Sequence, residues 1–100
     1  MFWAVHCLDK PNSKGTRDEF LAVHRAYLDE NAGILFFSGP LQNDDASANH
    51  GSLFILNVPG RGEAEAFAAN EPFNQNGVFK SVTITRMRKG RYNPELADKV

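Results

Sequence analysis

The order of patterned segments along the chain is the feature that most constrains its fold. Segments rich in β-branched and aromatic residues alternate with segments of helical periodicity, and short runs containing Gly, Pro, Asn and Asp separate them. In chain order they predict strand, helix, strand, strand, helix and strand. The segments cover residues 2–8, 16–31, 34–38, 51–58, 62–70 and 78–87. This order predicts an α+β domain built on an antiparallel sheet.

The first predicted helix has one apolar face. The residues of that face follow the i, i+1, i+4, i+7 and i+8 spacing and are Phe20, Leu21, His24, Tyr27 and Leu28. Arg17 falls among the charged residues of the other side, and Thr16 with Glu19 predicts a capping box at the N-terminus of the helix. The second helix is rich in alanine, and Pro72 is expected to end it.

The β-α-β-β-α-β order is that of the ferredoxin-like arrangement, a four-stranded antiparallel sheet with two helices on one face. The other face of such a sheet has no cover within the chain. The predicted strands nevertheless carry apolar residues on both faces, as residues 2–8 and 51–58 do. A sheet this apolar on both sides needs a second cover. We therefore expect the open face to pack against a second copy of the chain, giving a homodimer.

Length and charge limit the class of protein. A chain of 100 residues has room for a single domain, residues 1–100, of which residues 89–100 are expected to form a polar C-terminal tail. Hydrophobic residues make up 42% and charged residues 23% of the chain, as in ordinary globular domains. The net charge is −1 with the signs interspersed, so neither a nucleic acid nor an anionic membrane is indicated as a partner.

Cysteine usage and the first residues suggest a compartment. Cys7, the one cysteine, lies in an apolar run and is expected to be a small buried residue rather than a nucleophile. An internal disulfide is impossible, which fits a reducing compartment. No apolar stretch reaches the roughly 18 residues of a membrane span. The first residues lack the basic region and cleavage site of a signal peptide, so a cytoplasmic location is expected.

A histidine and a carboxylate are the candidates for acid–base chemistry. His24 lies on the apolar helix face, and Glu71 directly precedes Pro72 at the end of the second helix. If the fold brings them together, the carboxylate fixes the tautomer of the imidazole and orients its ring. Otherwise His24 is a core histidine hydrogen-bonded to the backbone, and Glu71 is an exposed carboxylate at a helix end. The residues alone leave both interpretations open.

Three further side chains are candidates for substrate binding. Ser38 precedes a Gly-Pro turn, and its hydroxyl could bind substrate or could instead form a hydrogen bond with the backbone of that turn. His6 could reach either the site or the dimer face. Phe73 belongs to a set of aromatic residues that could line a small apolar pocket.

A metal site needs three or four ligands. His24 and Glu71 supply two, with His6 a possible third, so neither a metal nor another cofactor is expected. The chain has no GxSxG elbow, P-loop or dinucleotide fingerprint.

Taken in order, four short motifs make the chain resemble the YciI-like (YCII-related) proteins, small bacterial domains of the dimeric α+β barrel type. The motifs are Trp3 to Pro11 with its Asp-Lys-Pro turn, Arg17 to Leu28 around the histidine, Ser38-Gly39-Pro40-Leu41, and Asn70-Glu71-Pro72-Phe73 followed by Gly77-Val78-Phe79. Together they span nearly the whole chain. The resemblance implies a homodimer and an active site built on His24 and Glu71.

The resemblance also bears on substrate binding and on function. The family often has an arginine three residues before the histidine, where this chain has Leu21, and Arg17, one turn earlier, is the candidate to bind substrate in its place. A few relatives are linked to the breakdown of chlorinated or hydroxylated aromatic compounds. One expectation is a small cofactor-free enzyme of lyase or hydrolase type, acting through His24 and Glu71 on a small metabolite such as an aromatic compound. The alternative is a non-catalytic domain, either a small-molecule binder or an accessory protein.

Overall fold

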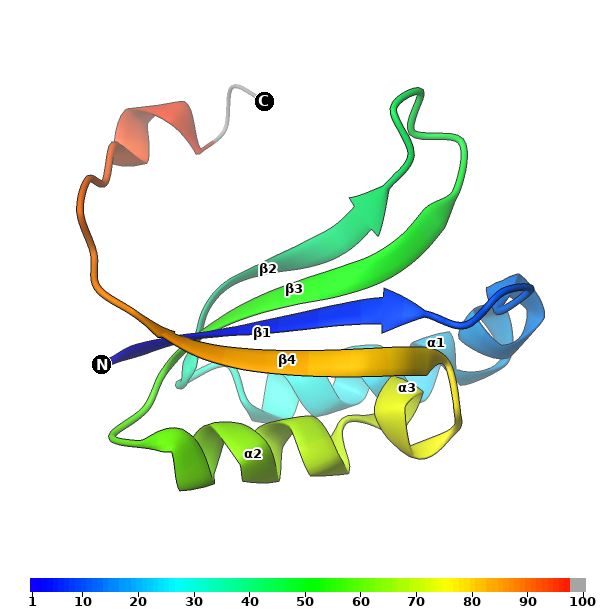
Figure 1. Cartoon of the computed structure of the whole chain (residues 1–100), viewed down its shortest axis with the longest axis horizontal. Coiled ribbons are helices and arrows are strands. Elements are labelled where there is room, and N and C mark those ends of the chain that lie inside the picture. Colours follow the sequence, from blue (N-terminus) through cyan, green and yellow to red (C-terminus); the bar gives the residue numbers. More distant parts are fainter. Residues whose placement is uncertain (98–100) are drawn as a thin grey trace.

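The elements of the computed structural model follow the predicted order, with two short helices added (Figure 1). The structure describes residues 1–97. Its elements are β1 (Phe2–Asp9), α1 (Lys14–Glu30), β2 (Leu35–Gln42), β3 (Asn49–Asn57), α2 (Arg61–Asn70), α3 (Pro72–Gln75), β4 (Phe79–Met87) and a terminal 3-10 helix (Pro94–Leu96). No helix in this described part is long and apolar enough to cross a membrane. The predicted α+β fold is confirmed.

The four strands form one antiparallel sheet in the order β2-β3-β1-β4. β1 is an inner strand, and its Val5 lies opposite Phe54 of β3 and Ile84 of β4. Helices α1, α2 and α3 all lie on one side of this sheet (Figure 1). Because side chains alternate along a strand, every second residue of β1 faces these helices.

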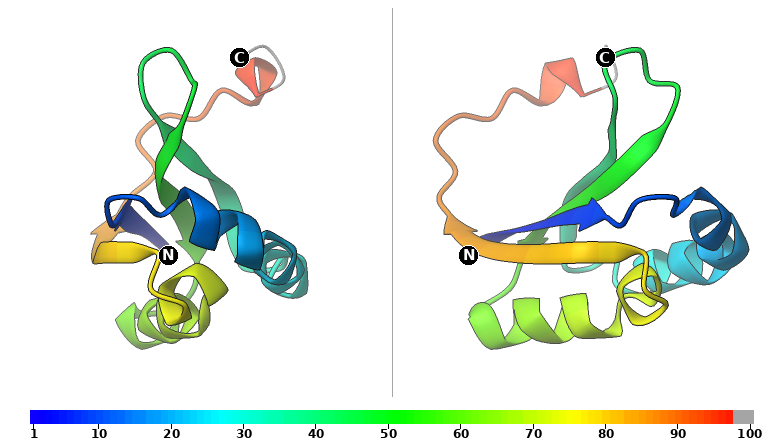
Figure 2. Two further views of the ribbon diagram at one scale, coloured as in Figure 1. Left: turned by 90° about the vertical axis from the view of Figure 1, so that its right-hand side faces the viewer. Right: turned by 45° about the vertical axis from the view of Figure 1, so that its right-hand side comes forward.

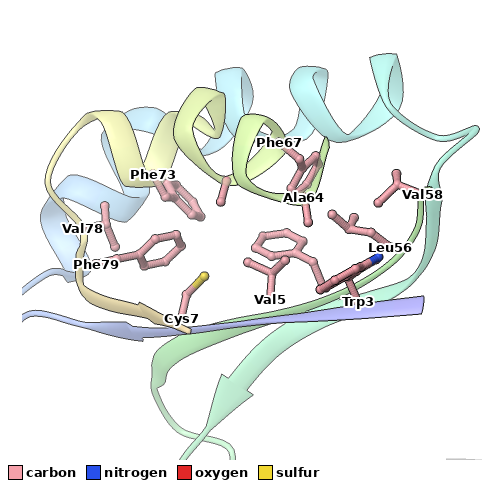
Figure 3. Packing of buried hydrophobic residues seen from close by; sticks show 12 residues of the cluster. Trp3, Val5, Cys7, Leu56, Val58, Ala64, Phe67, Phe73, Val78 and Phe79 are labelled. Carbon is pink, nitrogen blue, oxygen red and sulfur yellow. The ribbon is translucent and has the colours of Figure 1, made fainter. Parts of the chain in front are cut away.

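The hydrophobic core fills the layer between the sheet and the helices (Figure 3). Trp3, Val5 and Cys7 project from β1 toward the helices, where Phe67 of α2 and Phe73 of α3 meet them. The other buried apolar residues are Phe54, Leu56, Val58, Ala64, Ala68, Val78 and Phe79. This layer fixes α1 and α3 against the same face of the sheet, and that juxtaposition positions the site described below.

The opposite face of the sheet carries no helix from α1 to α3. On β1 this open face is formed by the residues that alternate with the core, namely Phe2, Ala4, His6 and Leu8. The chain that follows β4 crosses to this side, as the views of Figures 1 and 2 show. Its Tyr92 packs edge-on against Phe36, with ring centroids 5.6 Å apart. The predicted polar tail thus makes an aromatic contact, and its last three residues, 98–100, lie outside the described part.

The start of α1 differs from the prediction. The helix begins at Lys14, so the predicted capping box of Thr16 and Glu19 is wrong, and both residues lie inside the helix. Ser13 occupies the N-cap position, but its hydroxyl donates to the carbonyl oxygen of Lys10 instead of accepting a helix N–H. The turn leading out of β1 therefore sets where the helix begins, and helical periodicity does not report that turn.

Two prolines also occupy positions that the sequence did not predict. α2 ends at Asn70, before Pro72 as expected, but Pro72 itself opens α3, because its fixed φ suits a first helical position that needs no N–H donor. β2 was expected to end at Ser38 and instead continues through Pro40 to Gln42. β2 is an edge strand, and an edge strand tolerates a residue that cannot donate to the ladder.

Candidate active site

His24 and Glu71 are in contact although 47 positions separate them in the sequence. His24 comes from α1, and Glu71 is the residue that precedes α3. The imidazole Nδ1 is hydrogen-bonded to Oε1 of Glu71. Glu71 is 1% exposed and the His24 side chain 12%. The protein therefore encloses the carboxylate, and solvent reaches the pair from the imidazole side.

The first turn of α3 holds the Glu71 carboxylate. Glu71 is the N-cap residue of this short helix, and its Oε2 accepts the backbone N–H of Asn74 at 3.2 Å. A buried carboxylate needs such partners, since an unpaired charge is costly to remove from water. Pro72 fixes the backbone at the first helical position. The local sequence Glu-Pro thus builds the turn that directs the carboxylate toward α1.

Aromatic rings hold the imidazole in position. The ring of Phe73 stacks on His24 with centroids 3.9 Å apart and planes 10° apart. The ring of Phe54, from β3, is tilted relative to the imidazole, and the two ring centroids are 6.3 Å apart. Phe73 is fully buried, and its main contact is the stack that supports the imidazole. The structure thus places this predicted substrate-binding residue behind His24.

The contact with Glu71 selects one form of the imidazole. A carboxylate accepts hydrogen bonds, so Nδ1 carries the proton, and Nε2 of the neutral ring is then the basic atom. No residue in the described part forms a hydrogen bond with Nε2. His24 lines a cavity of about 290 Å³ between α1 and the strands β2 and β3. Nε2 is therefore the ring atom able to exchange a proton with a molecule in this cavity.

Arg17 is buried at the same site, which corrects its predicted place on the polar side of the helix. The guanidinium forms a two-pronged ion pair with Asp9, with N···O distances of 2.6 and 3.1 Å. Its Nη2 also donates to the carbonyl oxygen of Gly51 at 2.8 Å and to Oγ of Ser52 at 3.0 Å. The guanidinium carbon lies 4.8 Å from the centroid of Phe73. These long-range partners compensate the charge of Arg17 on the inner face of α1, where its spacing of four residues from Leu21 and seven from His24 puts it.

The cavity brings together most of the residues predicted for the site. Ser38, Arg17 and His24 line it, and Phe73 forms part of its wall. Ser38 lies opposite Phe54 in the β2–β3 register, so its side chain belongs to the helix-covered face. His6 is not part of this group, because it lies on the open face of the sheet and is exposed. Within one chain, His6 therefore does not reach the site at His24.

Cys7 lies beneath the site but is a poor nucleophile. Burial, and after it the negative charges of Glu71 and Asp9, raise the pKa of the Cys7 thiol from 9.0 to about 12, although Arg17 lowers it in part. The thiol therefore stays protonated at neutral pH. Among the described residues, no group of three or more His, Cys, Asp or Glu side chains has the arrangement to hold a metal ion.

Sequence reasoning missed three residues of the site. Asp9, interpreted as part of a turn, ends β1 and anchors Arg17. Its alternation with Cys7 and Val5 was the available signal, because it puts the carboxylate near the helix-covered face. Arg25 and Asn49 also line the cavity. The packing of α1 beside the β2–β3 hairpin brings both to the site, and a local pattern in the sequence does not report that packing.

Comparison with known proteins places this geometry in a family. No curated protein matches the chain. The structure of 5-chloro-2-hydroxyhydroquinone dehydrochlorinase from Burkholderia phenoliruptrix AC1100, solved in complex with 2,5-dihydroxybenzoquinone, is similar with a TM-score of 0.82 and 26% sequence identity. The match covers 90% of this chain and 96% of that one. The family model of the YCII-related domain matches residues 1–88. The chain therefore belongs to the YCII-related, or YciI-like, family.

Proposed function

We propose that this protein is a small cofactor-free enzyme that moves protons on a single-ring hydroxylated aromatic or quinone compound. His24 is the acid–base group, and Glu71 orients it. The observation that carries the proposal is the hydrogen bond between Glu71 and Nδ1, which leaves Nε2 basic beside a cavity. A free surface histidine would have neither the fixed tautomer nor the enclosed surroundings.

The chemistry follows from these positions. Nε2 takes a proton from an acidic O–H or C–H of the bound compound, and the buried carboxylate of Glu71 stabilises the imidazolium that forms. The imidazolium then returns the proton to another atom of the substrate or to the group that leaves. The Phe73 stack keeps the ring from rotating during both transfers. Arg17 and Ser38 are suited to bind substrate oxygens in the same cavity.

Cavity size favours a small substrate. A volume of about 290 Å³ lies at the lower end of the range for ligand sites, and one six-membered ring with a few substituents fits it. The dehydrochlorinase of similar structure acts on a single-ring hydroquinone and was solved with a single-ring quinone. That likeness supports a compound of the same class for this chain.

A homodimer formed through the open sheet face belongs to the same proposal. The open face is apolar on both inner strands, where Leu8 of β1 and Leu53 and Ile55 of β3 are found. Phe37 of β2 lies beside Ile55 on this face and is 65% exposed. An apolar surface of this kind on a single chain marks an interaction site, and a second copy offers the same surface in return.

Turnover of defined compounds tests the enzymatic role. Purified protein is incubated with 5-chloro-2-hydroxyhydroquinone and its chlorine-free analogue, and chloride release and ring absorbance are followed. We expect turnover in the wild type and a loss of about a hundredfold or more in His24→Asn and Glu71→Gln. Glu71→Gln keeps an oxygen for the Asn74 N–H, so it tests the charge without removing the cap of α3.

His50→Gln is the matched control, because His50 is exposed and does not line the cavity of His24. Its activity is expected to equal that of the wild type. Tight binding of 2,5-dihydroxybenzoquinone without turnover of any related ring would reject the enzymatic role and favour the binding-domain alternative. Activity that survives in both His24→Asn and Glu71→Gln would reject the proposed acid–base pair.

A further inference from the structure

The cavity beside His24 continues toward solvent along α1. A second cavity, of about 400 Å³, lies between α1 and the turn that joins β2 to β3. The two cavities share four lining residues, Arg17, Leu21, Arg25 and Asn49. They are therefore two parts of one cleft, an inner part at His24 and an outer part at the β2–β3 turn.

The charges that line this cleft are mainly positive. The basic groups are Lys14, Arg17 and Arg25, and Asp18 is the one carboxylate in either lining. Asp18 is paired with Lys14 at 2.7 Å. Arg25 has no ion-pair partner within residues 1–97. The cleft thus carries an uncompensated positive charge where its two parts meet.

Arg17 adds an unused donor inside the cleft. Its Nε and Nη2 make all four of its hydrogen bonds, to Asp9, Gly51 and Ser52. Its Nη1 makes none with the described residues, although the Arg17 side chain is only 10% exposed. Nη1 is thus an accessible donor on a side chain that lines both parts of the cleft, and a guanidinium N–H in this position favours an acceptor there, most of all a negatively charged oxygen.

We infer that the substrate binds as an anion, a planar ring bearing an ionised oxygen such as a phenolate, enolate or carboxylate. Arg17 Nη1 and Arg25 bind the charged oxygen, and the ring then lies beside Nε2 of His24. Arg25 is the residue that selects for charge, since Arg17 is already neutralised by Asp9. The inference rests on the proposed function and adds the substrate class. A hydroxyquinone such as 2,5-dihydroxybenzoquinone belongs to this class, because conjugation of its hydroxyls to the carbonyls makes it acidic.

Equilibrium binding of matched probes tests the inference. Benzoate and benzamide have nearly the same size and differ in charge, and 2,5-dihydroxybenzoquinone serves as the hydroxyquinone. By calorimetry we expect benzoate to bind about tenfold more tightly than benzamide. Arg25→Gln should weaken both anions about five- to tenfold, and Arg25→Lys should retain most of the affinity, because it keeps the charge. Added salt should weaken the anions and leave benzamide unchanged.

Arg88→Gln is the matched control, since Arg88 follows β4 at the end of the sheet where Phe2 pairs with Met87, far from Gly51 and the cleft. Equal affinity for benzoate and benzamide, an unchanged affinity in Arg25→Gln, or no saturable binding of either anion would each overturn the inference. The proposed function fails differently, through turnover that does not depend on His24 and Glu71. His24→Asn should lose turnover and still bind the anions.

Discussion

Glu71 serves the fold and the site through its two oxygens. Oε2 caps α3 by accepting the N–H of Asn74, and Oε1 orients His24. The same carboxylate therefore determines where α3 begins and which imidazole nitrogen is basic. A change that removes both oxygens would alter the helix and the chemistry together. An amide separates the two roles, because it retains an acceptor and loses the negative charge.

Cys7 illustrates how burial, and after it the charges of the site, raise the pKa of a neighbouring residue. Its pKa of about 12 keeps the thiol protonated, so we expect native protein to react with a disulfide reagent at pH 8 about a thousandfold more slowly than the urea-unfolded chain, whose thiol has the ordinary pKa of 9.0. The measurement is the absorbance of the released thiolate. Rapid reaction of the folded protein would mean that Cys7 is ionised and belongs to the chemistry.

The raised pKa of Cys7 also makes the stability of the folded protein depend on pH in the alkaline range. A pKa raised by folding favours the protonated form, so this stabilisation is complete below pH 9 and is lost as the pH rises toward 12. Tyr27 adds to the effect, because burial and then the charges of Glu71 and Glu30 raise the pKa of its hydroxyl, which donates to the carbonyl of Phe67. Urea unfolding should therefore give a midpoint that falls steadily above pH 9.

The positions of single residues were predictable where a local sequence pattern indicated them. The apolar stripe of the first helix put His24 on the inner face, and the Glu-Pro sequence marked Glu71. Arg17 was assigned to the polar side because of its charge, although its spacing of four residues from Leu21 and seven from His24 puts it on the inner face. Its partners Asp9, Gly51 and Ser52, which make that burial possible, were not predictable. Ion pairs between distant segments leave no periodic signal in the sequence.

At the scale of elements, Gly51 permits the close approach of β3 to β1. A Cβ at this position would collide with the carbonyl oxygen of Cys7 and crowd the side chain of Leu41. Gly51→Ala should therefore destabilise the protein by about 1–3 kcal/mol, measured by urea unfolding. It should also disturb Arg17, which donates to the Gly51 carbonyl. Gly39→Ala is the control, since nothing lies within 4 Å of its added carbon. Equal stability of the two variants would refute the argument.

The order of the elements followed from the sequence, but several of their ends did not. Strand and helix periodicities are local, and they gave the β-α-β-β-α-β order and the antiparallel sheet correctly. The ends of α1 and β2 depend on the turn after β1 and on the edge position of β2, neither of which is local. The helix α3 was missed because Pro72 was interpreted only as a stop, whereas proline also suits the start of a helix.

At the scale of the whole molecule, the apolar open face of the sheet predicts that two chains associate as a homodimer. Light scattering at micromolar concentration should give about twice the 11.1 kDa mass of one chain. Leu53→Glu puts a charge on an inner strand, between His6 and Gly39 of the neighbouring strands. Since an unpaired charge resists burial, this variant should dissociate at least about a hundredfold more readily than the wild type.

Val23→Glu is the control for that charge. Val23 lies on α1, on the helix-covered side of the sheet, and is 55% exposed, so a glutamate there remains in water whether or not the open faces pair. The control should keep the mass of the wild type. A wild type that is monomeric at tens of micromolar would remove the open face as an interface. A Val23→Glu variant that dissociates as readily as Leu53→Glu would instead place the interface on the helices, because only contact through α1 would bury that charge.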